Sequence, residues 1–146
     1  MKIAVASDHA GFELKEMIRK YLSDKDIQVL DFGAFSTQSV DYPDYAFPAS
    51  ESVASGVADY GILICGTGTG MSITANKVNG IRAANCMSEE LAEMARKHNN
   101  ANVLTMGARI ISPELAFKII DVFLENEFEG ARHQNRIDKI HNLTGI

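Results

Sequence analysis

The chain has 146 residues, which at roughly 100 to 200 residues per domain predicts one domain covering residues 1–146. Apolar residues make up 46% and charged residues 23%, an ordinary globular mixture that argues against disordered, collagen-like and fibrous classes. The net charge of −5 repels nucleic-acid backbones and anionic lipid, so neither nucleic acid nor a membrane surface is expected as a partner.

The sequence shows no membrane or secretion signal and few cysteines. No window approaches eighteen uninterrupted apolar residues, and the amino terminus becomes polar after a few apolar positions, so neither a spanning helix nor a secretory signal is expected. The chain has two cysteines, Cys65 and Cys86, and no closely spaced Cys or His pair of the kind that holds zinc. We therefore expect a reduced, cytoplasmic protein without a metal site.

Short apolar runs of strand length alternate with helical patterns in the first half of the chain. A strand is expected over residues 2–7, and the next helix has an apolar stripe formed by Leu14, Met17, Ile18, Tyr21 and Leu22. A second strand is expected over residues 27–32. A weaker helical pattern covers about residues 45–53, after a polar loop that contains Asp41 and Tyr42.

The alternation continues in the second half. Strands are expected over residues 60–65, 82–86 and 103–106, and a helix over residues 71–78. Ser88 is the expected N-cap of a helix that ends near residues 97–99, and Ser112 with Pro113 starts another helix. Five strands that alternate with helices imply parallel pairing and right-handed crossovers. The predicted fold is therefore a three-layer α/β/α sandwich around a five-stranded parallel, Rossmann-like sheet, with the strand order left open.

The segment from Glu129 to the end is an addition to this sheet. Ile137, Ile140 and Leu143 form a short apolar stripe after the last strand, and such an appended helix needs a surface to pack on. A neighbouring subunit is one candidate for that surface, so we expect a C-terminal helix that is used in subunit association.

Chemistry-bearing residues collect where the predicted strands end, which is where ligands bind in open parallel sheets. They are Asp8 and His9, Asp41 and Tyr42, residues 65–72, and residues 106–109. Gly66, Gly68 and Gly70 give the strongest local signal, because three alternate glycines allow close backbone approach and leave N–H groups free to hold an anion. The loop matches neither the Walker nor the dinucleotide pattern. A tight turn without a ligand is the alternative.

Cys65 stands at the end of a predicted buried strand and at the start of this loop. Free amides and a helix N-terminus favour a thiolate there, so Cys65 is a candidate reactive thiol, and a small buried apolar residue is the alternative. Cys86 lies inside a strand without glycines around it, and we expect it in the core.

Other candidates are weaker when each is taken alone. His98 falls at the end of a predicted helix, where a capping role competes with a catalytic one. Arg132 and Arg136 are four residues apart, so a helix would put both on one face, where they could clamp a phosphate together with Arg109. A solvated basic face is the competing interpretation.

As a set, the motifs of this chain resemble the ribose-5-phosphate isomerase type B family, which includes galactose-6-phosphate and allose-6-phosphate isomerases. The resemblance covers almost the whole chain. The matching segments are Ser7–Gly11, Asp41–Pro43, Ile64–Gly70, Ala75–Lys77, Gly80–Arg82, Arg96–Asn99, Asn102–Val103, Gly107–Arg109 and Glu129–His133. It implies an enzyme without metal or organic cofactor that interconverts an aldose phosphate and a ketose phosphate through an enediolate. Ribose 5-phosphate and ribulose 5-phosphate are the expected pair, as in the pentose phosphate pathway.

The resemblance also implies roles for individual residues. Cys65 matches the general base and His98 the residue that helps to open the sugar ring, while the amides of the Gly66, Thr67, Gly68, Thr69 and Gly70 loop would stabilise the oxyanion. Met71 stands where some members carry a glutamate base, which favours Cys65. The matched substrate-binding positions are Asp8, His9, Tyr42, Asn99, Arg109, Arg132 and Arg136, with His9 and the arginines on the phosphate.

The family's active site is shared between two subunits, so the resemblance implies a homodimer or homotetramer in which the basic C-terminal segment reaches a neighbour. It does not choose the sugar. A galactose-6-phosphate or allose-6-phosphate isomerase is the alternative within the class, and a nucleotide or flavin binding module is the alternative from another class.

Overall fold

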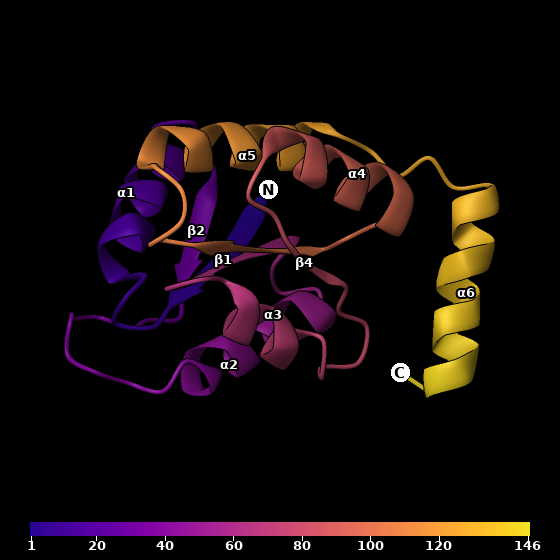
Figure 1. Ribbon diagram of the computed structural model, residues 1–146, viewed down its shortest axis with the longest axis horizontal. Helices are drawn as coiled ribbons and strands as arrows, with labels where there is room; N and C mark the ends of the chain where they lie inside the picture. Colours follow the sequence, from indigo (N-terminus) through magenta and orange to yellow (C-terminus); the bar gives the residue numbers. More distant parts are fainter.

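The computed structural model describes residues 1–146 as five strands and six helices that alternate along the chain (Figure 1). The strands are β1 (Lys2–Ser7), β2 (Gln28–Asp31), β3 (Tyr60–Cys65), β4 (Ala83–Asn85) and β5 (Val103–Gly107). The helices are α1 (Phe12–Ser23), α2 (Pro43–Ala54), α3 (Thr69–Ala75), α4 (Glu89–Asn99), α5 (Pro113–Glu125) and α6 (Arg132–Thr144). None of these helices combines the length and the apolar composition that crossing a membrane requires.

The strand order of the single sheet is β2-β1-β3-β5-β4, and every neighbouring pair is parallel. The chain passes from β1 to β2 on one side and then returns to place β3 on the other side of β1. Ligands of open parallel sheets bind outside the carboxyl ends of the strands at such a reversal. The order that the sequence left open therefore points to the carboxyl ends of β1 and β3.

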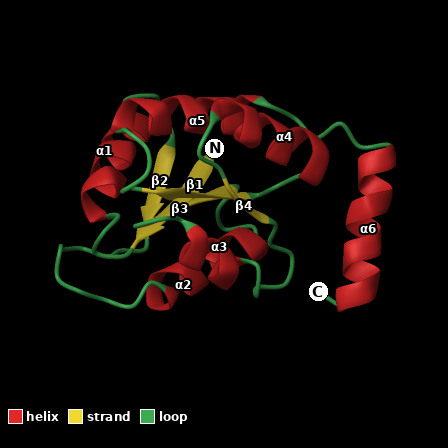
Figure 2. Cartoon of the chain, viewed as in Figure 1, coloured by secondary structure: helices red, strands yellow, loops and turns green.

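Helices cover both faces of the sheet, which confirms the three-layer sandwich (Figure 2). One core cluster joins the sheet to α1, α4 and α5, and the other joins it to α2 and α3. Along β3, Ile62 and Ile64 belong to the first cluster, whereas Leu63 and Cys65 belong to the second. Side chains alternate between the faces of a strand, so Cys65 lies on the face covered by α2 and α3.

Local signals placed most element boundaries within a few residues. The expected N-caps are confirmed, because Ser88 Oγ accepts the N–H of Leu91 at 3.3 Å and Ser112 Oγ accepts that of Leu115 at 3.2 Å. The apolar stripe of α1 is partly wrong. Met17 is 48% exposed, whereas Lys15, which was not in the stripe, is completely buried. The buried lysine has a carboxylate partner on β2, which helical periodicity does not reveal.

Helix α6 is appended beside the sandwich, as the sequence predicted, and stands apart from it in the ribbon view (Figure 2). It buries His133 and Ile137, but Ile140 is 53% exposed and Leu143 is 77% exposed. A groove of about 370 Å³ separates it from the residues around β4, with a mainly apolar lining that includes Ile81. Much of the apolar stripe of α6 is therefore uncovered in a single chain.

Two neighbouring apolar residues of α1 provide a test of the core. Ile18→Ala removes a side chain with no exposed surface, so we expect a loss of about 2 to 5 kcal/mol in the free energy of unfolding. Met17→Ala, on the exposed side of the same helix, should change it by less than about 0.5 kcal/mol. Urea unfolding followed by circular dichroism measures both values, and equal losses would contradict the observed orientation of α1.

Candidate active site

The Cys65 thiol lies at the carboxyl end of β3 with an amide donor beside it. The residue is 5% exposed, and its Sγ accepts the backbone N–H of Gly68 at 3.1 Å. Gly68 has φ of 79°, and a Cβ at this position would lie 2.3 Å from Oδ1 of Asn85. A residue with a side chain would have to move this loop. Glycine therefore permits the turn that holds an N–H group against the sulfur.

The rest of the loop runs from this contact into α3, which begins at Thr69. Gly66 and Gly68 are buried, whereas Thr67 and Thr69 are exposed, so the loop has an inner side and a solvent side. The Arg109 N–H donates to the carbonyl of Gly66 at 3.1 Å, and its guanidinium lies next to Gly66, where a Cβ would be 3.2 Å from Nη1. The structure thus brings the positive charge of Arg109 to the loop.

Asp8 and His9 follow β1 at the same edge. The Asp8 N–H donates to the carbonyl of Ile64 at 3.2 Å, and Asp8 Oδ1 accepts the N–H of Gly11 at 3.0 Å. Asp8 is 8% exposed, so these bonds fix a carboxylate one strand away from Cys65. His9 Nδ1 accepts the N–H of Val40 at 3.3 Å, which leaves the other ring nitrogen free for a ligand.

Tyr42 completes this edge from the segment before α2. Its ring packs against Gly70, where a Cβ would lie 2.8 Å from Cζ of the phenol. The sequence-predicted residues Asp8, His9, Tyr42, Cys65 to Gly70 and Arg109 therefore lie together at the carboxyl edge of the sheet. We call this group the carboxyl-edge cluster.

His98 and Asn99 lie at the opposite edge of the sheet. They end α4, and Arg82, which directly precedes β4, donates from Nε to the carbonyl of Asn99 at 3.1 Å. The amino and carboxyl ends of a strand as long as β3 are roughly 15 to 20 Å apart at about 3.3 Å per residue. Within one chain, the structure does not bring His98 or Asn99 to Cys65.

A histidine pair surrounds this second position. The rings of His98 and His133 stack with centroids 4.3 Å apart and an interplanar angle of 6°. Glu129 Oε2 lies 4.0 Å from Nε2 of His98 and 3.9 Å from Nε2 of His133. Burial lowers the pKa of His133, and the neighbouring His98, Arg132 and Arg136 lower it further, against the opposing effect of Glu129, so the neutral form of this ring is favoured.

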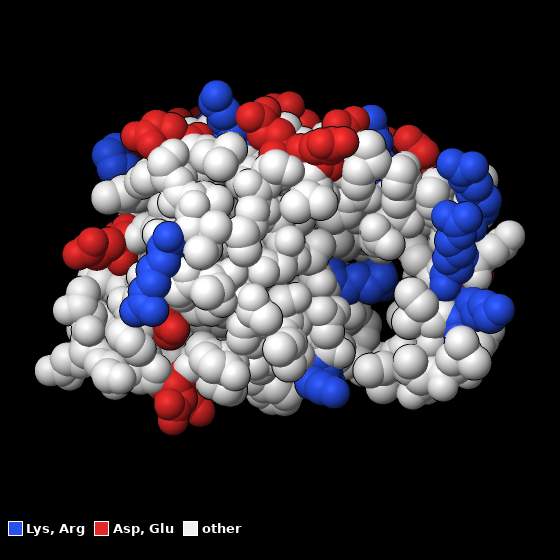
Figure 3. Space-filling view, viewed as in Figure 1, with Lys and Arg blue, Asp and Glu red and all other residues white.

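Arg132 and Arg136 lie on the first turns of α6, and both are exposed. The helix confirms that they share a face, and basic side chains line α6 in the space-filling view (Figure 3). They accompany His98 and not Arg109, because the Glu129 N–H donates to the carbonyl of Lys97 and ties this segment to α4. The expected clamp of Arg109 with Arg132 and Arg136 is therefore not formed within one chain. We call His98, Asn99, Arg132 and Arg136 the amino-edge cluster.

His98, Glu129 and His133 are also the set that could hold a metal ion, since their ligand atoms lie within 4.8 Å of one another. The geometry does not favour it. Imidazole lone pairs lie in the ring plane, so two parallel rings do not direct them at one point. Nε of Arg132 is also 3.5 Å from Nε2 of His133, and a guanidinium there opposes a cation. The arrangement favours hydrogen bonding or proton handling over metal binding.

Sequence reasoning missed three polar residues near these clusters. Asn85 ends β4, and its Nδ2 donates to the carbonyl of Thr67 at 3.3 Å. The rule that site residues follow strand ends would have found it. Glu129 and His133 have the i, i+4 spacing of a helical pair next to Arg132, which is a weaker signal.

Comparison with known proteins identifies relatives of the whole chain. A family model described as Ribose/Galactose Isomerase matches residues 3–140. Ribose-5-phosphate isomerase B of Escherichia coli strain K12 is 47% identical over 139 residues, which are 95% of this chain and 93% of that protein. Ribose-5-phosphate isomerase B of Clostridium thermocellum superposes with a TM-score of 0.98 at 48% identity, covering 99% of this chain and 98% of that one. The Mycoplasma genitalium enzyme, solved with bound ribulose 5-phosphate, gives 0.94 at 45% identity, covering 99% and 96%.

The two cysteines should differ in reactivity. Burial raises the pKa of the Cys86 thiol to about 11, so only about 0.1% of it is ionised at pH 8. Cys65 has an N–H donor aimed at its sulfur. We expect iodoacetamide at pH 8 to modify Cys65 at least about tenfold faster than Cys86, as measured by peptide mass spectrometry. Both should react equally in denaturant, and equal rates in the folded protein would contradict the assignment of the two environments.

Proposed function

The chain belongs to the ribose/galactose isomerase family, and from this membership we propose that it interconverts ribose 5-phosphate and ribulose 5-phosphate. The observation that carries the proposal is the Cys65 thiol at the end of β3 with the N–H of Gly68 at its sulfur and Asp8 on the adjacent strand end. Ribulose 5-phosphate bound to the Mycoplasma genitalium relative, which has nearly the same fold, supports the pentose phosphate as substrate.

Cys65 is the proposed general base. Its thiolate takes the proton from the carbon next to the carbonyl, which leaves an enediolate. A proton then passes from the hydroxyl oxygen on that carbon to the former carbonyl oxygen, and the thiol returns its proton to the former carbonyl carbon. Atoms and charge balance without a redox partner, because the substrate is isomerised internally. Met71 follows the loop, and its thioether cannot accept a proton, so it offers no competing base.

The loop amides have the complementary role. Negative charge develops on the substrate oxygen as the proton leaves, and N–H groups fixed in place before the reaction stabilise that charge most. The amides of the loop from Gly66 to Gly70 are assigned this role, because the Gly68 N–H already lies at the Cys65 sulfur, and Arg109 adds a positive charge beside Gly66. Asp8 is assigned to the sugar hydroxyls, and His9 with Arg109 to the phosphate.

A second copy of the chain is proposed to complete the site. His98 is assigned to opening the sugar ring, Asn99 to the sugar, and Arg132 with Arg136 to the phosphate. In one chain all four lie at the amino edge, away from Cys65. The exposed apolar side chains of α6 support a helix that packs against a neighbour. We therefore propose a homodimer, or a homotetramer made of two such dimers, in which each site takes the carboxyl-edge cluster of one copy and the amino-edge cluster of its partner.

The proposed activity is tested by measuring ketose formation from ribose 5-phosphate, galactose 6-phosphate and allose 6-phosphate in parallel. We expect turnover of ribose 5-phosphate with the highest kcat/KM. A higher kcat/KM on either hexose phosphate would identify the chain as a hexose-phosphate isomerase instead. Turnover of none of the three substrates would refute the proposal.

The control for this assay is Cys65→Ala prepared in the same way. Removal of a general base costs about a hundredfold or more in rate, so this variant should fall at least that far while keeping its affinity for substrate. Retention of more than about a tenth of the wild-type rate would remove Cys65 from the proton-transfer step.

The shared site predicts complementation between two inactive variants. Cys65→Ala damages the carboxyl-edge cluster and Arg136→Ala the amino-edge cluster, so a mixed dimer keeps one intact site of two. After subunit exchange, an equal mixture should recover about a quarter of the wild-type activity, because half of the dimers are mixed and each has one working site. Absence of recovery, with exchange verified by native mass spectrometry, would contradict a site built from two copies.

A further inference from the structure

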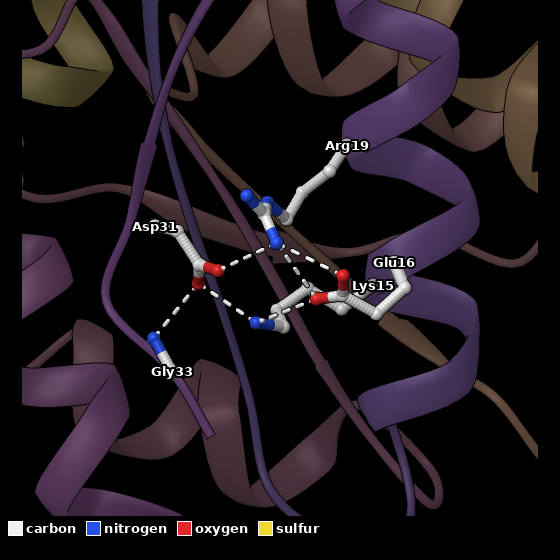
Figure 4. Close-up of polar contacts among 5 residues, drawn as sticks. All are labelled: Lys15, Glu16, Arg19, Asp31 and Gly33. Carbon is white, nitrogen blue, oxygen red and sulfur yellow. Dashed lines mark hydrogen bonds and ion pairs between the residues drawn. The ribbon is translucent and has the colours of Figure 1, made fainter. Parts of the chain in front are cut away.

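Lys15 is the one lysine of the chain whose side chain is completely buried, and an acidic partner lies on the next strand. Its Nζ is 2.7 Å from Oδ1 of Asp31, the last residue of β2, and 3.2 Å from Oε1 of Glu16 (Figure 4). Arg19, one turn further along α1, places Nη1 3.1 Å from Oδ2 of the same aspartate. The Asp31 side chain is only 13% exposed.

Asp31 also accepts the backbone N–H of Gly33 at 2.9 Å, so one carboxylate binds α1 and the start of the following segment (Figure 4). The carbonyl of Gly33 accepts the N–H of Ser7 at 2.6 Å, and the N–H of Ala34 donates to the carbonyl of Ser7 at 2.8 Å. These bonds fasten the chain after β2 to the end of β1, directly before Asp8.

The fastened segment then passes along the carboxyl-edge cluster. Phe35 places its ring 5.3 Å from Nζ of Lys15. Val40 donates its N–H to His9, and the ring of Tyr42 packs on Gly70. Residues 35–39 between these contacts are exposed, so the position of Val40 and Tyr42 depends on how the two ends of the segment are held.

We propose that Asp31, held in place by Lys15, is a positioning residue of the isomerase site: through the amide of Gly33 it fixes the segment that brings Val40 to His9 and Tyr42 to the glycine loop. The inference rests on the proposed function, since it concerns the binding of the sugar phosphate by that site. Packing alone does not require these residue types. An apolar pair of similar volume fills a core equally well, but only an acceptor at position 31 can hold the Gly33 N–H.

Two double variants separate the acceptor from the ion pair. Lys15→Met with Asp31→Asn removes both charges but keeps an Oδ1 for the Gly33 N–H, whereas Lys15→Met with Asp31→Leu removes the charges and the acceptor. We expect the leucine double variant to raise KM for ribose 5-phosphate at least about tenfold with kcat changed less than about threefold. The asparagine double variant should stay within about threefold of wild type in both constants. Equal KM values for the two double variants would overturn the proposal.

The control is an exposed ion pair at the C-terminal end of the same helix. Lys20 and Asp24 lie 2.7 Å apart with side chains 77% and 63% exposed, so Lys20→Met with Asp24→Leu makes the same chemical change away from the site. KM and kcat should remain those of wild type. A rise in KM equal to that of the buried leucine variant would show a general effect of the changed residue types and would overturn the proposal.

Hydrogen exchange tests the positioning without using activity. The amides of Gly33 and Ala34 should be protected in the wild type, and those of Ala34 and Val40 should exchange faster in the leucine double variant. If circular dichroism shows that this variant does not fold, the test uses the wild-type protein alone. The proposal is then overturned if the amides of Gly33 and Ala34 exchange as fast as those of residues 36–39. A wild-type protein inactive on all three sugar phosphates but protected at these amides would refute the proposed function alone.

Discussion

The carboxyl edge of the sheet depends on two backbone segments approaching more closely than side chains allow. A Cβ on Gly68 would lie 2.8 Å from the carbonyl carbon of Met106, and a Cβ on Gly107 would lie 2.8 Å from that of Thr67. Because both positions are glycine, the loop after β3 and the end of β5 meet backbone to backbone, and the Gly68 N–H reaches the Cys65 sulfur. The same contact brings Arg109, two residues after Gly107, to the glycine loop. One close approach of the backbone therefore places an amide donor and a cation near the Cys65 thiol.

The parallel topology places the amino-edge cluster on the opposite edge of the sheet from the Cys65 thiol. A helix that connects two parallel strands starts at the carboxyl edge and returns to the amino edge, so His98 at the end of α4 lies on the far side of the sheet from Cys65. The 129–136 segment docks on the end of α4 and carries its arginines to the same side. Under the proposed function, a single chain holds two incomplete halves of a site. Association then controls activity directly, and dilution below the dimer dissociation constant removes catalysis without unfolding either chain.

The sequence predicted what local signals determine, including the bounds of β1 and β3, the serine caps of α4 and α5, and the glycine loop that ends in a helix. It left the strand order open because pairing between distant strands has no local signature. The direction of α4 follows from the βαβ pattern, so the separation of His98 from Cys65 within one chain is predictable from the sequence. Lys15 was missed for a different reason. Helical periodicity assigns polar residues to the surface, and the carboxylate that permits burial belongs to another element.

The buried pair also has an energetic consequence for how the site is maintained. Loss of one partner of a buried ion pair costs about 3 to 5 kcal/mol, a large part of the roughly 5 to 15 kcal/mol that stabilises a domain. A single substitution at Lys15 or Asp31 is therefore disfavoured whether or not the site is needed, whereas paired replacement by apolar residues carries no such cost. Beyond stability, the charged pair fixes the orientation of the carboxylate: Asp31 Oδ1 pairs with Lys15 and also accepts the Gly33 N–H, while Oδ2 pairs with Arg19. The cost of losing one charge thus disfavours single substitutions at Lys15 and Asp31, the residues that position the segment beside the thiol. Neither residue belongs to the clusters that would contact substrate.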